Sequence, residues 1–143
     1  MVLPFRPPST QTLSAPLPAE VGRRAEAEAA RFLRRERGFK LLARNWRNPR
    51  DRREEIDLIA RDGAVLVFVE VKARSARARV PGFHAVDGRK RDALRRACRA
   101  YLGLLDRKPR TFRLDVVEVE AGASGPVLRH YRNIPLFSKY FRG

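Results

Sequence analysis

Three residues near the middle of the sequence have the types and spacing of a metal-dependent hydrolytic site. Asp57 lies thirteen residues before Glu70, and Lys72 follows Glu70 after one apolar residue. Carboxylate oxygens are ligands that Mg²⁺ and Mn²⁺ prefer, and Mg²⁺ usually keeps several bound waters. A lysine beside such an ion can orient or help deprotonate a metal-bound water, or stabilise charge that develops on a phosphate. We therefore take all three residues as catalytic candidates, and the two acids as candidate metal ligands.

The two acids fall on segments with the composition of β-strands. Residues 55–59 alternate polar and apolar side chains over their first half, and residues 65–71 are mostly β-branched and aromatic. Asp62-Gly63 between them is a strong hairpin signal. The sequence therefore predicts an antiparallel hairpin with Asp62 and Gly63 as its two loop residues.

Such a hairpin would gather polar residues on one face of a sheet. With this loop, Asp57 is expected opposite Phe68, and Glu55 opposite Glu70. Because side chains repeat with a period of two, one face would carry the polar residues of both strands, namely Glu55, Asp57, Glu70 and Lys72. Asp57 and Glu70 would be diagonal neighbours with Cβ atoms roughly 7–8 Å apart, which leaves room for one cation. Acids on an apolar sheet need compensating positive charge, so Mg²⁺ or Mn²⁺ is the expected cofactor and Glu55 a further candidate ligand.

The charge balance predicts a polyanionic partner. The chain has 32 Lys and Arg residues against 16 Asp and Glu residues, which gives a formal net charge of +16. Phosphate neutralisation with counterion release would make binding strongly dependent on salt. A basic ribosome-associated protein would share this charge, so the charge predicts nucleic-acid binding and not hydrolysis. The candidate nucleic-acid contacts lie in the loop 48–53, after Lys72 and on the second expected helix: Arg50, Arg52, Arg53, Arg74, Arg77, Arg79, Arg89, Lys90, Arg95 and Arg96.

Length and composition bound the class of protein. A chain of 143 residues suits one domain and is short for two. Its single cysteine, Cys98, excludes an internal disulfide framework and a zinc-finger cluster, and fits a reducing cytoplasm. No apolar run approaches the roughly 20 residues of a membrane span, and no signal-peptide pattern is present. Phosphate-loop, nucleophile-elbow and dinucleotide-binding motifs are also absent from the sequence. We expect a cytoplasmic protein without a membrane partner.

Hydrophobic periodicity predicts two helices and five strands. Residues 1–19 are rich in proline and show no sustained periodicity, so we expect a flexible tail before a single domain of residues 20–143. The expected elements of that domain are, in order, a helix over 20–37, a strand over 39–46, the two hairpin strands, a helix over 87–105, and strands over 111–120 and 127–133. This αβββαββ order suits an α/β fold with a mixed sheet flanked by helices.

Glu26 is a further candidate on the first helix. It lies on the margin of the apolar stripe, so it can reach a metal cluster if that helix packs beside the acidic strands. A solvated glutamate flanked by Arg23 and Arg24 is the commoner outcome for a residue of this kind.

The spacing of Asp57 and Glu70-Val71-Lys72 resembles the PD-(D/E)xK signature of restriction-endonuclease-like nucleases. The sequence is more closely similar to the YraN family of small bacterial proteins, which themselves resemble archaeal Holliday junction resolvases. The resemblance runs from Gly22 to about Asn133 and rests on motifs that occur in order: GRRAEAEAARFL, LLARNWR, EIDLIA, VFVEVKAR, AVDGRKRDAL and FRLDVVEV.

This resemblance implies a restriction-endonuclease-like three-layer fold and roles for individual residues. It implies that Asp57 and Glu70 bind the metal, that Val71 lends its carbonyl oxygen, and that Lys72 is catalytic, with Glu26 as an accessory acid. The sequence departs from the pattern at two further positions. Ile56 replaces the proline of the signature, and Glu54 replaces the usual glycine of the family, which bears on how the loop 48–53 approaches a substrate.

Two functions therefore compete. The first is a Mg²⁺- or Mn²⁺-dependent DNA endonuclease, with branched or distorted DNA as a candidate substrate. A homodimer is plausible on such a substrate because a junction presents two symmetric scissile strands. The second is a non-catalytic nucleic-acid-binding module that keeps a nuclease fold, in which the acids pair with arginines as a structural network.

Overall fold

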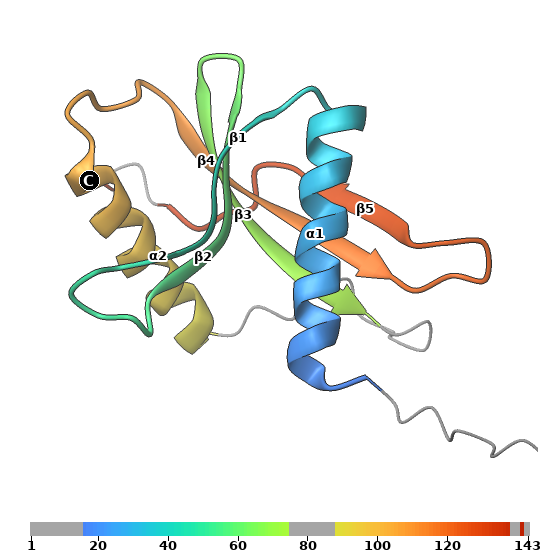
Figure 1. Ribbon diagram of the computed structural model, residues 1–143. Helices are drawn as coiled ribbons and strands as arrows, with labels where there is room; N and C mark the ends of the chain where they lie inside the picture. The colour runs from blue at the N-terminus through green and yellow to red at the C-terminus, as the bar shows by residue number, and fades with distance from the viewer. Residues whose placement is uncertain (1–15, 75–87, 138–140, 142–143) are drawn as a thin grey trace, which may run out of the picture.

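The computed structural model of the protein describes residues 16–74, 88–137 and 141 (Figure 1). Its elements are α1 (Pro18–Glu36), β1 (Lys40–Arg47), β2 (Glu55–Asp62), β3 (Val65–Arg74), α2 (Gly88–Leu104), β4 (Phe112–Glu120) and β5 (Val127–Tyr131). The predicted order of helices and strands is confirmed. Residues 1–15 of the predicted tail lie outside the described residues. The helix α1 begins at Pro18, whereas the predicted helix began at residue 20.

The five strands form one mixed sheet in the order β1-β2-β3-β4-β5. β3 and β4 are parallel, and the other neighbouring pairs are antiparallel. Parallel neighbours need a crossover connection, and α2 lies in the one between β3 and β4. Figure 1 shows α1 and α2 on opposite sides of the sheet, so the expected α/β arrangement of a mixed sheet flanked by helices is confirmed.

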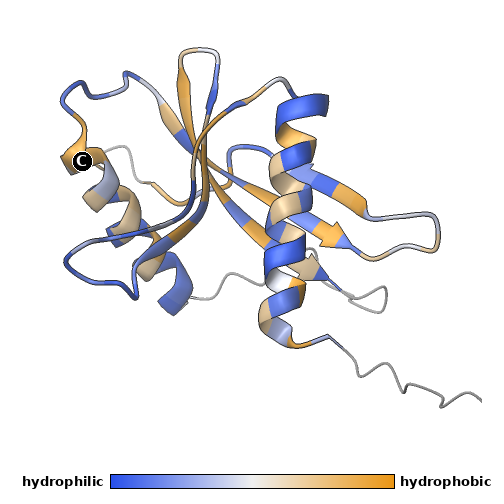
Figure 2. Ribbon diagram, in the orientation of Figure 1, coloured by the Kyte–Doolittle hydropathy of each residue, from blue (hydrophilic) through white to orange (hydrophobic). Residues whose placement is uncertain are grey.

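Each side of the sheet has its own hydrophobic cluster. Ala25, Ala29 and Leu33 repeat every four residues along α1 and are buried against one face. Leu94 and Cys98 of α2 are buried in the cluster on the other face. Figure 2 shows hydrophobic residues concentrated in the strands, and hydrophilic residues in the loop between β1 and β2 and at the start of α2. Among the described residues, neither helix is long and apolar enough to cross a membrane.

The predicted loop of the acidic hairpin is wrong by one residue. Asp62 pairs with Val65, so the loop residues are Gly63 and Ala64. Gly63 has a φ of +59°, and Ala64 is not among the residues with positive φ. A glycine at the first loop position matches a type II′ turn, whereas a type I′ turn needs positive φ at both loop residues.

The corrected register changes which residues face each other across the hairpin. Phe68 pairs with Ile59 and not with Asp57, and the observed ladder ends at Leu58 and Val69. Asp57 and Glu70 each lie one residue beyond this last pair. The predicted arrangement, in which the two acids were diagonal neighbours, rested on a register that the structure does not have.

β2 does not keep strict alternation around Asp57. Ile56 packs in the α2-side cluster, although Leu58, two residues later, packs in the α1-side cluster. On β1, Asn45 has a φ of +50° and lies between the partners of these two residues. Asparagine tolerates this left-handed conformation better than most residues. Period-two alternation therefore no longer assigns Glu55 to the face of Asp57.

The C-terminal aromatic residues dock on the α2-side cluster. The Phe137 and Phe141 rings lie 5.0 and 5.8 Å from the Phe112 ring, measured between centroids. Both side chains therefore belong to the packing of the α2-side cluster.

Candidate active site

Glu70 is a buried acid that only partly finds partners. Its side chain is 2% exposed. Its Oε1 lies 3.1 Å from Nζ of Lys72 and 3.4 Å from Nζ of Lys90. Its Oε2 is buried and has no hydrogen-bond partner among the described residues. A buried carboxylate oxygen without a partner is unfavourable, so this atom has capacity for a ligand from outside the chain.

The backbone of β3 holds Asp57 beside Glu70. Asp57 Oδ2 accepts a hydrogen bond of 2.7 Å from the backbone N–H of Val71, the residue directly after Glu70. The contact lies just beyond the end of the β2–β3 ladder, where Leu58 pairs with Val69. The Asp57 side chain thus accepts a hydrogen bond from the β3 backbone at the point where the backbone pairing of β2 with β3 ends.

The two acids are short of positive charge. Burial, followed by the charge of Glu70, raises the pKa of Asp57 to about 8. The Val71 N–H and the Lys90 ammonium act in the opposite direction but do not outweigh these effects. Asp57 therefore keeps a proton at neutral pH unless another cation is present. Shifts of this kind mark sites where carboxylates are arranged for chemistry or for a cation.

The oxygen atoms of these residues suit a hard divalent cation. Asp57 and Glu70 would hold Mg²⁺ or Mn²⁺ through carboxylate oxygens, and the carbonyl of Val71 is the backbone ligand that the resemblance implies. No group of three or more His, Cys, Asp or Glu side chains suited to a metal ion occurs in residues 16–74, 88–137 and 141. Mg²⁺ often binds through one or two carboxylates and several waters, so two acids suffice.

Lys72 lies between this pair and a third buried acid. It pairs in register with Glu118 on the parallel strand β4. Glu118 accepts a hydrogen bond of 3.1 Å from the Tyr131 hydroxyl, and its Oε1 has no hydrogen-bond partner among the described residues. Sequence reasoning missed Glu118 because only the β3–β4 register brings it beside Lys72.

Glu26 and Glu55 stand further from the centre of the site. Glu26 is half-buried on α1, and its charge contributes to the raised pKa of Asp57, as the smallest of the five causes. The Glu55 carboxylate lies 3.2 Å from the Arg47 guanidinium on β1. The structure thus brings Glu26 within electrostatic range of Asp57, and it pairs Glu55 with an arginine.

Lys90 was predicted only as a phosphate contact, and it lies at the acid pair. Burial alone lowers the pKa of Lys90, but Glu70 and Asp57 outweigh burial and raise it. The signal for this position was available: α2 follows the carboxyl end of β3, and the start of a crossover helix lies near that end of the strand. A basic residue in its first turn is therefore a neighbour of the Glu70-Lys72 segment.

Glu54 connects the arginine-rich loop 48–53 to α2 through hydrogen bonds. It is 8% exposed, and it receives hydrogen bonds of 2.8 Å from Asn48 Nδ2 and 3.0 Å from Arg96 Nε. A backbone hydrogen bond from Asn48 to the Glu54 carbonyl closes the same loop at 3.0 Å. This residue, which replaces the usual glycine, therefore fixes the loop 48–53 against the basic face of the helix.

The basic residues that were predicted to contact nucleic acid differ in how far they already pair with other groups of the protein. Arg50, Arg52, Arg53 and Arg89 are exposed, and Arg53 pairs with Asp51 at 2.9 Å. Arg95 donates to the Leu136 carbonyl and to Asp92. Arg74 lies 3.9 Å from Glu118. Arg77 and Arg79 lie outside the described residues.

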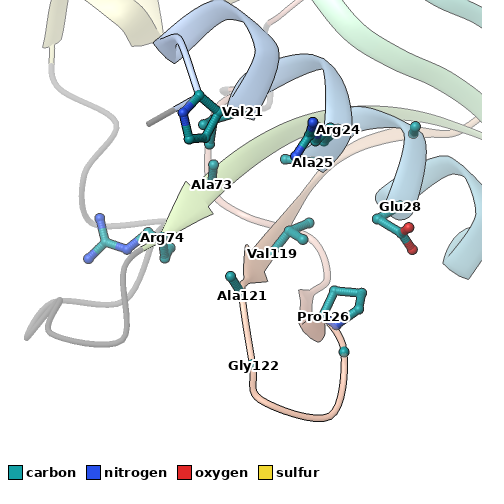
Figure 3. A pocket seen from close by; sticks show the side chains of 13 residues that line it. Val21, Arg24, Ala25, Glu28, Ala73, Arg74, Val119, Ala121, Gly122 and Pro126 are labelled. Carbon is teal, nitrogen blue, oxygen red and sulfur yellow. The ribbon is translucent and has the colours of Figure 1, made fainter. Parts of the chain in front are cut away.

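A separate pocket of about 490 Å³ lies between α1 and the β4–β5 hairpin. Figure 3 shows Val21 and Ala25 of α1 on one side, with Val119 and Pro126 on the other. None of the residues of the acid pair lines this pocket. The candidate chemistry and this cavity therefore occupy different places in the fold.

Comparison with known proteins places the same residues in a region that matches one protein family. The pattern of Uncharacterised protein family UPF0102 matches residues 25–119, which include the acid pair. A UPF0102 protein of Symbiobacterium thermophilum is 47% identical over 105 residues, which cover 73% of this chain and 86% of that protein. A UPF0102 protein of Beutenbergia cavernae is 40% identical over 115 residues, or 80% of this chain and 94% of that protein. A UPF0102 protein of Chlorobium phaeobacteroides is 38% identical over 105 residues, or 73% and 80%. These matches confirm the resemblance to the YraN family.

Proposed function

Because the chain belongs to the uncharacterised protein family UPF0102, a membership that carries no stated activity, we propose a function from its own site. We propose that it is a metal-dependent DNA endonuclease that hydrolyses phosphodiester bonds. Branched or distorted DNA is the substrate class to test first, because of the resemblance to Holliday junction resolvases.

One observation carries this proposal. Glu70 and Asp57 are neighbouring carboxylates in an apolar sheet; a Glu70 oxygen has no partner among the described residues, and Asp57 has a pKa of about 8. A divalent cation would relieve both conditions, and it would supply an acidified water and charge neutralisation at the phosphate.

The residues around the pair suit hydrolysis. The Val71 N–H fixes the Asp57 carboxylate at 2.7 Å, which limits its freedom before any ligand binds. Lys72, two residues beyond Glu70 and 25% exposed, can orient the attacking water or donate to a phosphate oxygen. In the reaction, water oxygen forms a bond to phosphorus while the bond from phosphorus to the leaving sugar oxygen breaks. Lys72 would stabilise the negative charge on the phosphate.

The surrounding charge supports a nucleic-acid substrate. The chain carries a net charge of +16, and exposed arginines lie in the loop 48–53 and on the first turn of α2. The first turn of α2 adjoins the acid pair through Lys90, and Glu54 joins the loop to Arg96 of the same helix. Phosphates could therefore contact arginines on either side of the acids.

A second function, a non-catalytic nucleic-acid-binding module, also has a specific observation in its favour. Lys72 and Lys90 both lie within 3.4 Å of Glu70 Oε1, so ammonium groups supply part of the charge that a metal would provide. The described residues also lack a third metal-binding acid in the group. On this alternative the protein binds DNA without turnover.

A cleavage assay separates the two functions. Labelled duplex, single-stranded, flap and four-way-junction DNA would be incubated with the protein in Mn²⁺, Mg²⁺ or chelator, for wild type and Asp57→Ala. We expect metal-dependent products from the wild type only. Asp57→Ala should keep its fold and much of its DNA affinity, because phosphate contacts come mainly from the arginines.

The matched control is Asp106→Ala, which removes an exposed carboxylate and changes the formal net charge by the same amount. It should cleave like the wild type. If the wild type binds DNA but gives no products with either metal, the non-catalytic module is favoured. If Asp57→Ala cleaves as fast as the wild type, Asp57 has no part in the mechanism.

A further inference from the structure

Glu70 has two ammonium neighbours that come from different parts of the fold. Lys72 lies on the same strand, whereas Lys90 lies in the first turn of α2. Lys72 Nζ is 3.1 Å and Lys90 Nζ 3.4 Å from the same oxygen, Glu70 Oε1. Lys90 also acts electrostatically on Asp57, so it is shared between the two acids.

We propose that Lys90 is the resident cation of the acid pair, and that a divalent cation displaces its ammonium from Glu70. This inference rests on the proposed metal site, and it assigns Lys90 a part in metal loading that is distinct from phosphate contact. Lys90 is accordingly a positioning residue that sets how readily the site accepts a metal.

Coulomb repulsion supplies the reason for displacement. A divalent ion on Asp57 and Glu70 would lie a few ångströms from two ammonium groups, and charges at that separation repel strongly in a partly buried site. Lys72 is tied to Glu70 by its position on the same strand face. Lys90 has the more exposed side chain, at 32% against 25% for Lys72, and its flexible four-carbon stem can turn toward solvent. A divalent cation would therefore displace the Lys90 ammonium and leave the Lys72 ammonium in place.

The resident ammonium has a second consequence for the metal-free protein. Without it, Lys72 would be the one remaining cation paired with Glu70 in residues 16–74, 88–137 and 141, and Glu70 Oε2 would still have no hydrogen-bond partner among these residues. Lys90 thus stabilises the metal-free fold while it weakens metal binding. These two effects have opposite signs, which makes them measurable together.

Mn²⁺ binding to the full chain tests this inference without any cleavage assay. The concentration of free Mn²⁺ would be followed by electron paramagnetic resonance for wild type, Lys90→Met, Lys90→Arg and the neighbouring control Arg89→Met. Loss of one cation next to the site should lower the Mn²⁺ dissociation constant of Lys90→Met by about tenfold or more. Arg89→Met, which removes an exposed charge one residue away, should change it by less than about threefold. Lys90→Arg keeps the charge and should remain close to wild type.

Thermal unfolding provides the second readout. In chelator, Lys90→Met should unfold at a lower temperature than Arg89→Met, and Mn²⁺ should raise its midpoint more than that of the wild type. Equal Mn²⁺ affinities in Lys90→Met and Arg89→Met, or weaker binding in Lys90→Met, would overturn the inference alone. A wild type that binds no Mn²⁺ would instead overturn the proposed metal site on which the inference rests.

Discussion

Asp57 shows how strongly its surroundings can change the chemistry of a residue. Its carboxyl accepts a hydrogen bond from the backbone N–H of Val71 and feels the charge of Glu70, and its pKa rises from 3.8 to about 8. A carboxyl with this pKa is mainly protonated at neutral pH. A metal ion that binds there must therefore displace a proton, so metal affinity should rise with pH up to about 8.

The raised pKa of Asp57 predicts a pH-dependent stability of the metal-free protein. Below pH 3.8 the folded and unfolded states both hold the proton, and between pH 3.8 and about 8 only the folded state holds it. Stability should therefore decrease as pH rises through this window. In chelator, the free energy of unfolding of wild type relative to Asp57→Asn should fall by on the order of a few kcal/mol between about pH 5 and pH 8. Denaturant titrations at several pH values check this, and parallel profiles for the two proteins would refute it.

Local sequence patterns were enough to predict the acids and not their partners. The strand composition and the spacing of Asp57, Glu70 and Lys72 come from neighbouring residues, which is why they were accessible. The contacts of Lys90 and Glu118 depend on the α2 crossover and the β3–β4 register, which bring distant segments together. Such contacts require the fold to be known first.

At the scale of elements, the loop between β1 and β2 is held against α2. Glu54 joins Asn48 and Arg96 through hydrogen bonds of 2.8 and 3.0 Å. These hydrogen bonds hold the loop in one position against α2, the helix that also carries Lys90. Arginines of the loop and of the helix can meet one DNA backbone without a prior rearrangement.

Removal of the Glu54 carboxylate should loosen this connection. Glu54→Ala leaves Asn48 and Arg96 without their partner, so we expect a loss of about 1–3 kcal/mol in the free energy of unfolding. Amide hydrogens of the loop 48–53 should also exchange faster. The control is Glu55→Ala, which removes a pair with Arg47 in which both side chains are at least 40% exposed, and which should cost less than about 1 kcal/mol. Equal losses in the two variants would show that Glu54 does not hold the loop.

The elements themselves were predicted to within a few residues, and the hairpin register was not. Both helices have alanine- or leucine-containing stripes with helical spacing, β3 begins with the apolar run 65–69, and β4 has adjacent apolar residues at Val116 and Val117. Asp62-Gly63 indicated a turn correctly, but the sequence does not say whether the glycine takes the first or second loop position. The structure places Gly63 first, and this choice pairs Phe68 with Ile59 in place of Asp57.

At the scale of the whole molecule, the two helices cover opposite faces of the sheet, each over its own hydrophobic cluster. Lys90 of α2 reaches Glu70, and Arg96 of the same helix pairs with Glu54 at the end of the loop 48–53. The αβββαββ order predicted from the sequence was sufficient for this general arrangement. The order of strands within the sheet was not predicted, because it depends on which strands pair after the crossover.

The excess of positive charge predicts salt-dependent DNA binding that is localised to the α2 side. For six to ten phosphate contacts, affinity should fall by roughly 10³–10⁵ between 50 and 200 mM salt. Arg52→Ala or Arg89→Ala should each reduce the slope of log affinity against log salt by about 1. Arg35→Ala, an exposed control on α1, should leave the slope nearly unchanged. Fluorescence anisotropy in chelator measures these slopes, and equal effects of all three variants would indicate binding without a preferred face.

The most direct test of the central claim is single-turnover cleavage of a four-way junction in Mg²⁺ by Glu70→Gln and wild type. Glutamine keeps the shape of Glu70 and removes the negative charge that would hold the cation. We predict products from the wild type, none in chelator, and a rate at least about a hundredfold lower for Glu70→Gln. Equal rates for the two proteins, or Mg²⁺-independent cleavage, would contradict a metal-dependent site at Asp57 and Glu70.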